Sequence, residues 1–577
     1  MNQPSPAIVA QNAVQRLPRW ALLLLCAAYI VPGYVGRDPW RGADMTALGY
    51  MLELAQGHTA WMAPLLGGIP PETDGLLPYW LGAWAMGLLS PGLPMELAAR
   101  VPFVLLLVLT LVATWYGIYA LARSPGAQPV AFAFGGEAQP ADYARAMADG
   151  GLLALLACLG LAQPSHETTS YLVQLCCTAL VFHGLAAAPL QRASATATLA
   201  VGSTGLVLSG APALAVLYPL GAAVLSLVCA DARAADDGAP RVRRPWPVLA
   251  LAVALGAALL AWWLDMWRWR LAWPHDQDKE WLGLARLLAW FTWPAWPLAL
   301  WTLWRWRRHI LQRQPQRHLL LPLWFVLIAL VSTVATQPAD RALLLSLPAL
   351  AALAAFALPT LRRSMAALID WFTLLFFSIS AIAIWVIWLS TQTGVPAKPA
   401  ANVAKLARGF VPEFSLAALA IALAATLAWC ALVTWRAGRH RSAIWKSLVL
   451  PAAGATLCWL LLMSLWLPML DYARSDAPQM RAVARLAGEP ACMHMHGLDR
   501  SQIAALQWHG KLRLVPLQAD APCGWLVLAP PDPTPAPHAP APLPAPDLSG
   551  WTLRHTVDRP TGRNDVLELY QRDAQRE

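Results

Sequence analysis

The feature that most constrains this chain is a series of long apolar runs that fill its first 470 residues. A membrane-spanning helix needs about 20 mostly apolar residues, with some tolerance. Thirteen runs meet this description, at 20–35, 101–122, 150–162, 171–187, 194–208, 212–230, 247–264, 284–304, 319–336, 342–359, 366–389, 414–435 and 448–467. Because 58% of the 577 residues are hydrophobic and 13% are charged, most of the chain needs an apolar medium. The sequence therefore predicts an all-α polytopic membrane protein with about 13 transmembrane helices.

The basic residues between the runs predict the orientation. If the runs cross the membrane in alternation, seven segments that carry arginine or lysine fall on one side. Such residues are concentrated on the cytoplasmic side of membrane proteins. This rule places the N-terminus in the cytoplasm and the tail from Asp471 onward on the outer side. It also gives the net charge of +10 a role in setting the topology. The chain has no basic tract interleaved with aromatic residues, so the sequence does not indicate a nucleic-acid partner.

The first run lacks a small-residue cleavage site and is therefore predicted to be a retained signal anchor. Between the first two runs lies an outer loop, 36–99, that is too polar to span. From Met45 to Ala55, apolar residues recur at helical spacing, which is typical of a helix lying on the bilayer surface. Segment 77–89 predicts a second helix of that kind, or a short span.

The tail, 471–577, is predicted to be a small α/β domain outside the transmembrane domain 1–470. Helical patterns and strand-like alternation follow one another at 478–486, 491–496, 501–508, 511–517, 524–529, 551–556 and 565–570. A Pro-rich insert, 530–546, predicts a flexible loop. Seven of the nine cysteines lie in apolar runs, whereas Cys492 and Cys523 lie on neighbouring strand-like segments. In an oxidising outer compartment they are expected to form a disulfide.

Polar residues gather on four separate outer loops. Carboxylates beside arginines at a membrane boundary suit a general base and the stabilisation of positive charge at a sugar carbon. Guanidinium groups match phosphate oxygens. The candidates are Asp38, Arg41 and Asp44 with Glu72 and Asp74 from a nearby turn, then His166 and Glu167, then Arg268, Arg270 and His275, and finally Arg341.

Each candidate also has a purely structural explanation. Asp44 suits a helix cap, Glu72 and Asp74 suit a solvated turn, and the arginines can reach lipid headgroups. His166 and Glu167 can satisfy loop backbone. His494 and His496 share a strand face, but without acidic or thiol neighbours they are not expected to bind a metal. The first loop has no two acidic residues side by side, so a bound divalent metal ion is possible but has no support in the sequence. We expect no cofactor.

Several motifs resemble one family of membrane-embedded enzymes. The loop with Asp38 is followed by Leu77-Pro78-Tyr79-Trp80 and by Ala99-Arg100-Val101-Pro102 at the start of the second run. This order resembles glycosyltransferases that use polyprenyl-phosphate sugars, in the branch of 4-amino-4-deoxy-L-arabinose lipid A transferase and the protein O-mannosyltransferases. The run that begins with Asp340 and Arg341 is similar to that family's Arg-Tyr-Leu-Leu-Pro segment. The resemblance is strongest over 20–122.

The resemblance implies a GT-C fold in the bacterial inner membrane with the C-terminal domain in the periplasm. It also implies inverting transfer of a sugar from a polyprenyl-phosphate carrier to a lipid A-like or other lipid or glycan acceptor. Asp38 then acts as base, and Arg268, Arg270 and Arg341 bind the leaving phosphate. The family often has an Asp-Glu pair in the first loop, where this chain has Asp38 followed by Pro39.

A second departure concerns the turn after the surface helix. The arabinose transferase has a segment resembling Glu-Lys-Pro-Pro there, whereas this chain has Glu72-Thr73-Asp74-Gly75. The identity of the transferred sugar therefore stays undetermined. A transporter or flippase for a lipid-linked envelope precursor is the alternative function, and a non-catalytic scaffold is a third. Transporters often carry ionisable residues within their spans and internal repeats. Here His183 is the clearest ionisable residue inside a run, and no repeat is evident, which favours the transferase.

Overall fold

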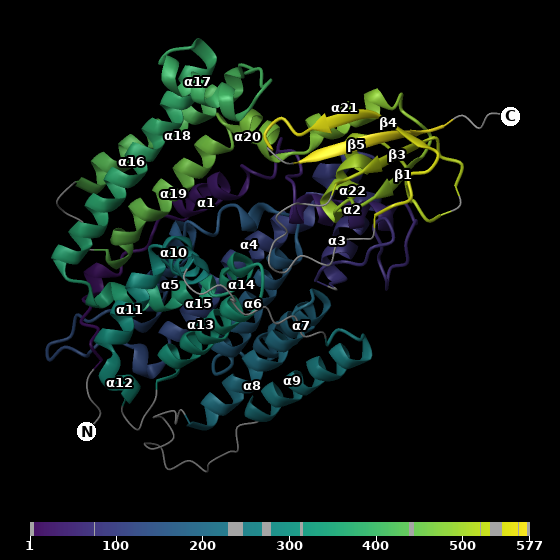
Figure 1. Ribbon diagram of the computed structural model, residues 1–577. Helices are drawn as coiled ribbons and strands as arrows, with labels where there is room; N and C mark the ends of the chain where they lie inside the picture. Colours follow the sequence, from purple (N-terminus) through teal and green to yellow (C-terminus); the bar gives the residue numbers. More distant parts are fainter. Residues whose placement is uncertain are drawn as a thin grey trace.

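The computed structural model describes residues 5–73, 75–228, 246–267, 279–311, 316–437, 443–519, 521–530, 545–562 and 565–573. It consists of a large helical body and a small sheet domain at one end (Figure 1). The longer helices of the body are α1 (Arg19–Ile30), α4 (Met95–Ala122), α5 (Pro140–Ala157), α6 (Ser170–Ala187), α7 (Arg192–Leu208), α8 (Pro212–Val228), α9 (Trp246–Trp263), α10 (Lys279–Phe291), α11 (Ala295–Arg305), α13 (Arg317–Ala335), α15 (Leu347–Ala357), α16 (Arg363–Thr393), α18 (Leu416–Ala437) and α19 (Val449–Leu462). Shorter ones are α12 (Arg307–Leu311), α14 (Ala339–Leu344), α17 (Ala397–Leu406) and α20 (Leu467–Arg474).

Each of the thirteen predicted runs overlaps at least one of these helices. Within the described residues, seven helices are long and apolar enough to cross a membrane, namely α4, α6, α9, α13, α16, α18 and α19 with the turn before it. Four more, α1, α8, α10 and α15, are apolar but shorter. The run at 284–304 is divided into α10 and α11 because Pro294 has no N–H to continue the helix. The prediction of a polytopic all-α membrane protein is confirmed.

The centre of the body is packed through small residues. Helix α5 is buried along most of its length, and a Cβ at Gly151 would lie 2.3 Å from the Ile118 side chain of α4. Helices α6 and α7 approach through their backbones, since a Cβ at Gly202 would lie 2.8 Å from the Cys177 carbonyl oxygen. Close backbone approach through small residues is the usual way that helices associate in lipid. This packing fixes the ends of α4 and α6, which carry part of the candidate site.

The first outer loop contains both expected helices, α2 (Ala43–Ala55) and α3 (Leu77–Leu89). The prediction that α2 lies on the bilayer surface is wrong in one respect, because its apolar residues Met45, Leu48 and Met51 are buried inside the protein. They pack between α3 and helix α22 (Arg500–His509) of the C-terminal domain. Helix α3 keeps Trp84 exposed, which suits a membrane interface.

The C-terminal domain has a five-stranded sheet covered by α21 (Ala477–Leu486) and α22 (Figure 1). The strands, in the order β2-β1-β3-β5-β4, are β1 (Met493–His496), β2 (Leu514–Pro516), β3 (Trp525–Leu528), β4 (Trp551–Asp558) and β5 (Val566–Arg572). β1 pairs in parallel with β2 and β3, and β5 runs antiparallel to β3 and β4. All five match predicted strand segments. Of the predicted Pro-rich insert, residues 531–544 lie outside the described residues.

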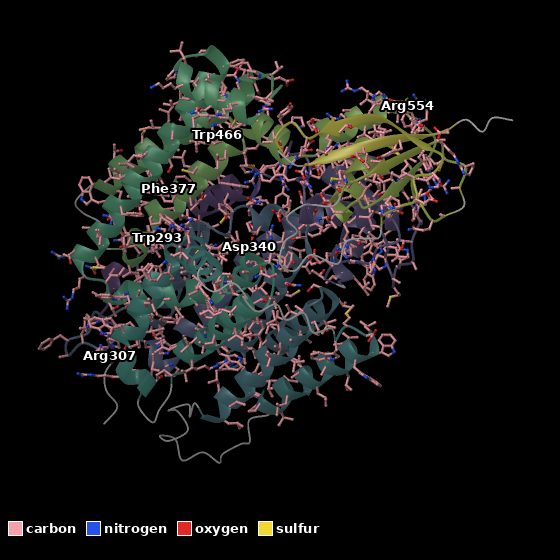
Figure 2. All side chains as sticks on the ribbon, viewed as in Figure 1. Trp293, Arg307, Asp340, Phe377, Trp466 and Arg554 are labelled. Carbon is pink, nitrogen blue, oxygen red and sulfur yellow. A yellow bond between two sulfur atoms is a disulfide. The ribbon has the colours of Figure 1, made fainter. Side chains whose placement is uncertain are left out.

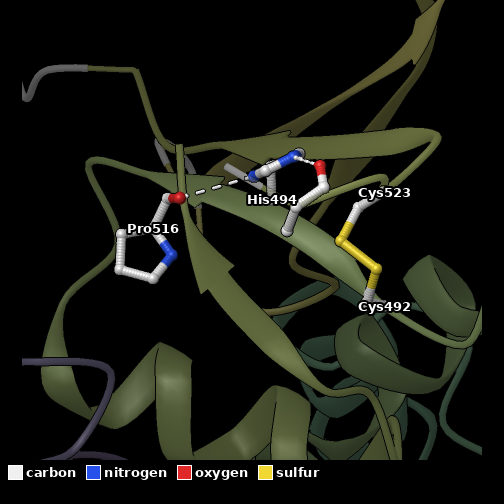
Figure 3. Close-up of a disulfide and its surroundings, with 5 residues drawn as sticks. Cys492, His494, Pro516 and Cys523 are labelled. Carbon is white, nitrogen blue, oxygen red and sulfur yellow. Dashed lines mark hydrogen bonds between the residues drawn. A yellow bond between two sulfur atoms is a disulfide. The ribbon is translucent and has the colours of Figure 1, made fainter. Parts of the chain in front are cut away.

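Cys492 and Cys523 form a disulfide between the start of β1 and the segment before β3 (Figure 3). Their Cα atoms are 5.4 Å apart. Beside them His494 is buried, and its ring nitrogens contact the carbonyl oxygens of Pro516 and Ala521. His494 therefore connects strands and turns rather than facing solvent.

Candidate functional site

The candidate site lies where the loop after α1 meets the starts of α2, α4 and α6. Three glycines in this loop, Gly33, Gly36 and Gly42, have positive φ angles of 95°, 75° and 94°. Only glycine adopts such angles without strain. At Gly33 a Cβ would also lie 2.6 Å from the Trp459 side chain. The chain can therefore turn sharply and fold Arg37–Asp44 back against the protein.

A fully buried ion pair lies beneath this loop. Arg37 is 1% exposed and Asp44 is 3% exposed, and the Arg37 Nη2 donates to Asp44 Oδ2 at 2.8 Å. Arg37 also donates to the carbonyl oxygens of Gly33 and His166. Thr168 donates its backbone N–H and its hydroxyl to Asp44 Oδ1, both at 2.8 Å.

These contacts decide the role of Asp44. Burial alone raises the pKa of the Asp44 carboxyl, but the Arg37 and Arg100 guanidinium groups and the Thr168 hydrogen bonds outweigh burial and hold it below its ordinary value. Both carboxylate oxygens already accept hydrogen bonds, so Asp44 joins α2 to the loop before α6. Asp44 is not the N-cap of α2 either, because Gly42 occupies that position.

A small recess opens beside this pair. It is a shallow depression lined by Pro39, Asp44, Leu48, Glu96, Arg100 and Thr168. The neighbouring Asp38 is half-buried, and its carboxylate makes no hydrogen bond or ion pair with any described residue. Asp38 and Glu96 are close enough for their charges to interact. Arg100, which is 3% exposed, donates to the Tyr34 carbonyl oxygen at 3.1 Å. The wall of the recess thus contains the Arg100 cation and the Glu96 carboxylate, and the Asp38 carboxylate lies beside it, where its charge acts on Glu96 and His509.

The second and fourth predicted clusters meet in one ion pair. Arg341 Nη2 lies 2.6 Å from Glu167 Oε2, and its guanidinium carbon lies 5.7 Å from the centre of the Tyr171 ring. Burial raises the pKa of Glu167, and Arg341 offsets part of that rise. Arg341 Nη1 and the Thr169 hydroxyl are buried and have no hydrogen-bond partner among the described residues. Asp340, labelled near the centre of Figure 2, marks this position in the molecule.

Side chains connect the two parts of the site. Gln163 donates to Glu167 Oε1 at 3.1 Å, and Arg474 of α20 donates to the Gln163 oxygen at 2.7 Å. The Arg474 guanidinium in turn lies 4.8 Å from the centre of the Trp40 ring. A continuous series of contacts therefore runs from Arg341 to the loop that carries Asp38.

The other predicted residues lie elsewhere or have other partners. The His166 ring is buried among Tyr29, Tyr34 and Trp459, and burial lowers its pKa to about 4, so it is neutral and structural. Arg41 faces carboxylates of the C-terminal domain rather than the recess. Glu72 is exposed. The predicted positions Asp74, Arg268, Arg270 and His275 lie outside the described residues.

No protein-family model matches the chain, and no curated protein matches it. Two solved structures do. The crystal structure of ArnT from Cupriavidus metallidurans bound to undecaprenyl phosphate is 14% identical, with a TM-score of 0.60 over 97% of this chain and 99% of that chain. The chain has the ArnT fold. The apo structure of the same ArnT is 15% identical, with a TM-score of 0.56 over 89% of this chain and 93% of that chain.

The likeness to ArnT includes the C-terminal domain as well as the helical body, because nearly the whole of both chains is covered. It confirms, at the level of fold, the resemblance that residues 20–122 indicated. Within the ArnT-like arrangement, the sequence missed Glu96 and Arg100 in the recess and Asp471 and Arg474 in α20. Arg100 belongs to the Ala-Arg-Val-Pro motif, whereas no local pattern marks Asp471.

Proposed function

We propose that this chain is an inverting glycosyltransferase that moves a sugar from a polyprenyl-phosphate carrier to a lipid or glycan acceptor of the cell envelope. Its fold is that of ArnT, which was crystallised with undecaprenyl phosphate. The observation that carries the proposal is the free, half-buried carboxylate of Asp38 beside a recess that contains the Arg100 guanidinium. A general base needs a carboxylate that is not already occupied by other donors.

In this mechanism the acceptor hydroxyl or amine attacks the anomeric carbon while the bond from that carbon to the phosphate oxygen breaks. The acceptor proton passes to the Asp38 carboxylate, and the polyprenyl phosphate leaves as an anion. Asp44 is unsuited to this step because both its oxygens accept hydrogen bonds from Arg37 and Thr168. Asp38 is therefore the base, and Asp44 supports the loop.

We propose Arg341 as a ligand of the donor phosphate. Its Nη1 is buried without a partner among the described residues, and Thr169 places an unpartnered hydroxyl in the same region. A buried donor of this kind costs free energy unless a ligand satisfies it. A phosphate oxygen is a suitable acceptor because guanidinium and phosphate form charge-assisted hydrogen bonds. Arg268, Arg270 and His275 remain predictions for the same function.

We propose that the reaction takes place on the periplasmic face of a bacterial inner membrane. Arg307 of α12 and Arg554 of the C-terminal domain lie at opposite ends of the molecule (Figure 2). The end that carries Arg307 suits the cytoplasm, where the basic residues between membrane spans concentrate. The disulfide between Cys492 and Cys523 supports an oxidising compartment for the other end. The division into a transmembrane domain, 1–470, and a periplasmic domain, 471–577, belongs to the same proposal.

Mass spectrometry of lipids and glycans from cells with and without the protein tests this function. We expect a glycosylated lipid or glycan that appears with the wild-type protein and is lost with Asp38→Asn. The matched control is Asp558→Asn, which changes an exposed acid on β4 that does not line the recess. Identical lipid and glycan profiles with and without the protein contradict the proposal.

A further inference from the structure

The chain after α19 contacts several neighbouring residues of the loop that carries Asp38. Four residues of this loop take part, namely Asp38, Trp40, Arg41 and Gly42. Their partners in α20 are Asp471 and Arg474. Their partners in the C-terminal domain are Asp476, Asp499, Ser501 and Asp565. The loop and its partners are separated by more than 400 positions in the sequence. The contacts therefore depend on the tertiary fold.

Asp471 makes the contacts nearest to the proposed base. Its carboxylate accepts the indole N–H of Trp40 at 2.8 Å, and the Asp38 backbone N–H lies close enough to lower the pKa of Asp471. These donors lie on either side of Pro39, which lines the recess. Proline fixes its own φ angle and has no N–H of its own. The Trp40 bond to Asp471 therefore fixes the loop directly after Pro39.

Trp40 extends this contact into the buried ion pair. Its side chain is 4% exposed and lies between two guanidinium groups, with Arg37 at 4.7 Å and Arg474 at 4.8 Å from its ring. Arg37 is the partner of Asp44 in the wall of the recess. A change at Asp471 therefore reaches the recess through Trp40 and Arg37 as well as through the backbone of Asp38.

Arg41 connects the same loop to the sheet domain. Its backbone N–H donates to the Arg474 carbonyl oxygen at 2.9 Å. Its guanidinium faces Asp565 at 2.5 Å, Asp499 at 3.7 Å and Asp476 at 3.8 Å. Arg559 is the second cation of this group, at 3.2 Å from Asp476. Three carboxylates and one further arginine leave a net negative charge on the domain, and Arg41 offsets part of it. The next residue, Gly42, donates its N–H to the Ser501 hydroxyl at 2.9 Å.

We infer that α20 and the C-terminal domain position the Asp38 loop for sugar transfer and that Asp471 of α20 is the positioning residue through which they act. This inference rests on the proposed function. Asp471 does not line the recess; its carboxylate bonds Trp40, and its charge acts on Asp38 and Arg100. Losing it should leave both parts of the protein folded while the base moves away from its productive position.

The test uses a graded series at one position in the full-length protein. Asp471→Ala removes both acceptors, and Asp471→Asn keeps one carbonyl oxygen. Displacement of a catalytic group by about 1 Å can lower a rate about 10²-fold. We expect kcat to fall by about that factor in Asp471→Ala and by less in Asp471→Asn, with KM for the donor nearly unchanged. The control is Tyr472→Phe on the same helix, whose hydroxyl donates to the Arg408 carbonyl oxygen and not to the loop.

Hydrogen exchange of the peptide that covers 36–44 gives a readout independent of turnover. We expect faster exchange there in Asp471→Ala than in wild type or Tyr472→Phe, with unchanged exchange in α4, α6 and the sheet. Wild-type exchange and kcat in Asp471→Ala, with Asp38→Asn inactive, overturn the positioning inference alone. Full transfer by Asp38→Asn instead overturns the proposed role of Asp38, and the inference with it.

Discussion

We expect Asp44→Ala to destabilise the protein by about 3–5 kcal/mol, the usual cost of removing one partner from a buried ion pair. Arg37 is 1% exposed, so water cannot replace the lost carboxylate. The Arg37 guanidinium keeps its bonds to the Gly33 and His166 carbonyl oxygens, which reduces the loss. Thr168, however, loses the acceptor of two hydrogen bonds, at about 1–3 kcal/mol for each buried donor left unsatisfied. The bonds that Arg37 keeps and the bonds that Thr168 loses act in opposite directions, so we expect the free energy of unfolding to fall by about 4 kcal/mol in total.

Two further variants separate this effect from a general loss of charge. Asp142→Ala removes a carboxylate whose partner, Arg16, is 68% exposed, and exposed pairs contribute about 0–1 kcal/mol. The double variant Arg37→Met, Asp44→Leu leaves no unpaired buried charge, while Thr168 loses the same acceptor as in Asp44→Ala. We therefore expect the double variant to be more stable than Asp44→Ala.

The assay is the fraction of detergent-purified protein that stays monodisperse after heating, measured for all variants in the same buffer. The order of stability should be wild type and Asp142→Ala first, then the double variant, then Asp44→Ala. Equal heat resistance of Asp44→Ala and Asp142→Ala would refute the reasoning, because it would show that the Arg37 charge needs no buried partner.

Three other predictions follow from the site and the C-terminal domain. Arg341→Met should raise the donor KM by about tenfold or more and Arg341→Lys by less, because lysine lacks the fork that matches phosphate; unchanged KM values would remove Arg341 from the phosphate site. Burial raises the pKa of Asp471 to about 7, so the folded protein keeps this proton at pH values where the unfolded chain, with an ordinary pKa of about 4, has lost it, and stability falls as pH rises from about 4 to about 7. The thermal midpoint should therefore fall more between pH 5 and 7 in wild type than in Asp471→Asn, and an equal fall would contradict that pKa. Cys492→Ala opens a loop with a sequence separation of 31, which costs roughly 3–4 kcal/mol in a chain-entropy description. It should make the C-terminal domain sensitive to protease, and unchanged digestion would argue against this.

The membrane helices and the strands could be predicted because their signals are local. The runs at 101–122 and 171–187 contain enough apolar residues to define α4 and α6 directly. Segment 77–89 coincides with α3, and the alternation of apolar residues located β1 and β5. Hydrophobic periodicity does not say what covers an apolar face, however. The stripe on α2 is covered by α22 and α3 rather than by lipid.

The candidate site was only partly predictable because its geometry depends on residues far apart in the sequence. Asp38 and Asp44 are similar as sequence features. They differ because Thr168 and Arg37 occupy the Asp44 carboxylate and no described residue occupies that of Asp38. Arg41 suited a phosphate by residue type, but the fold places it beside Asp476 and Asp565.

The rate of sugar transfer by purified Asp38→Asn protein in liposomes tests directly whether this carboxylate is the base. The liposomes contain a polyprenyl-phosphate sugar donor and the acceptor identified by mass spectrometry. We expect kcat to fall by about 10²–10⁴-fold, with wild-type yield and heat resistance, while Asp558→Asn keeps the wild-type rate. Transfer by Asp38→Asn at the wild-type rate would show that this carboxylate is not the base.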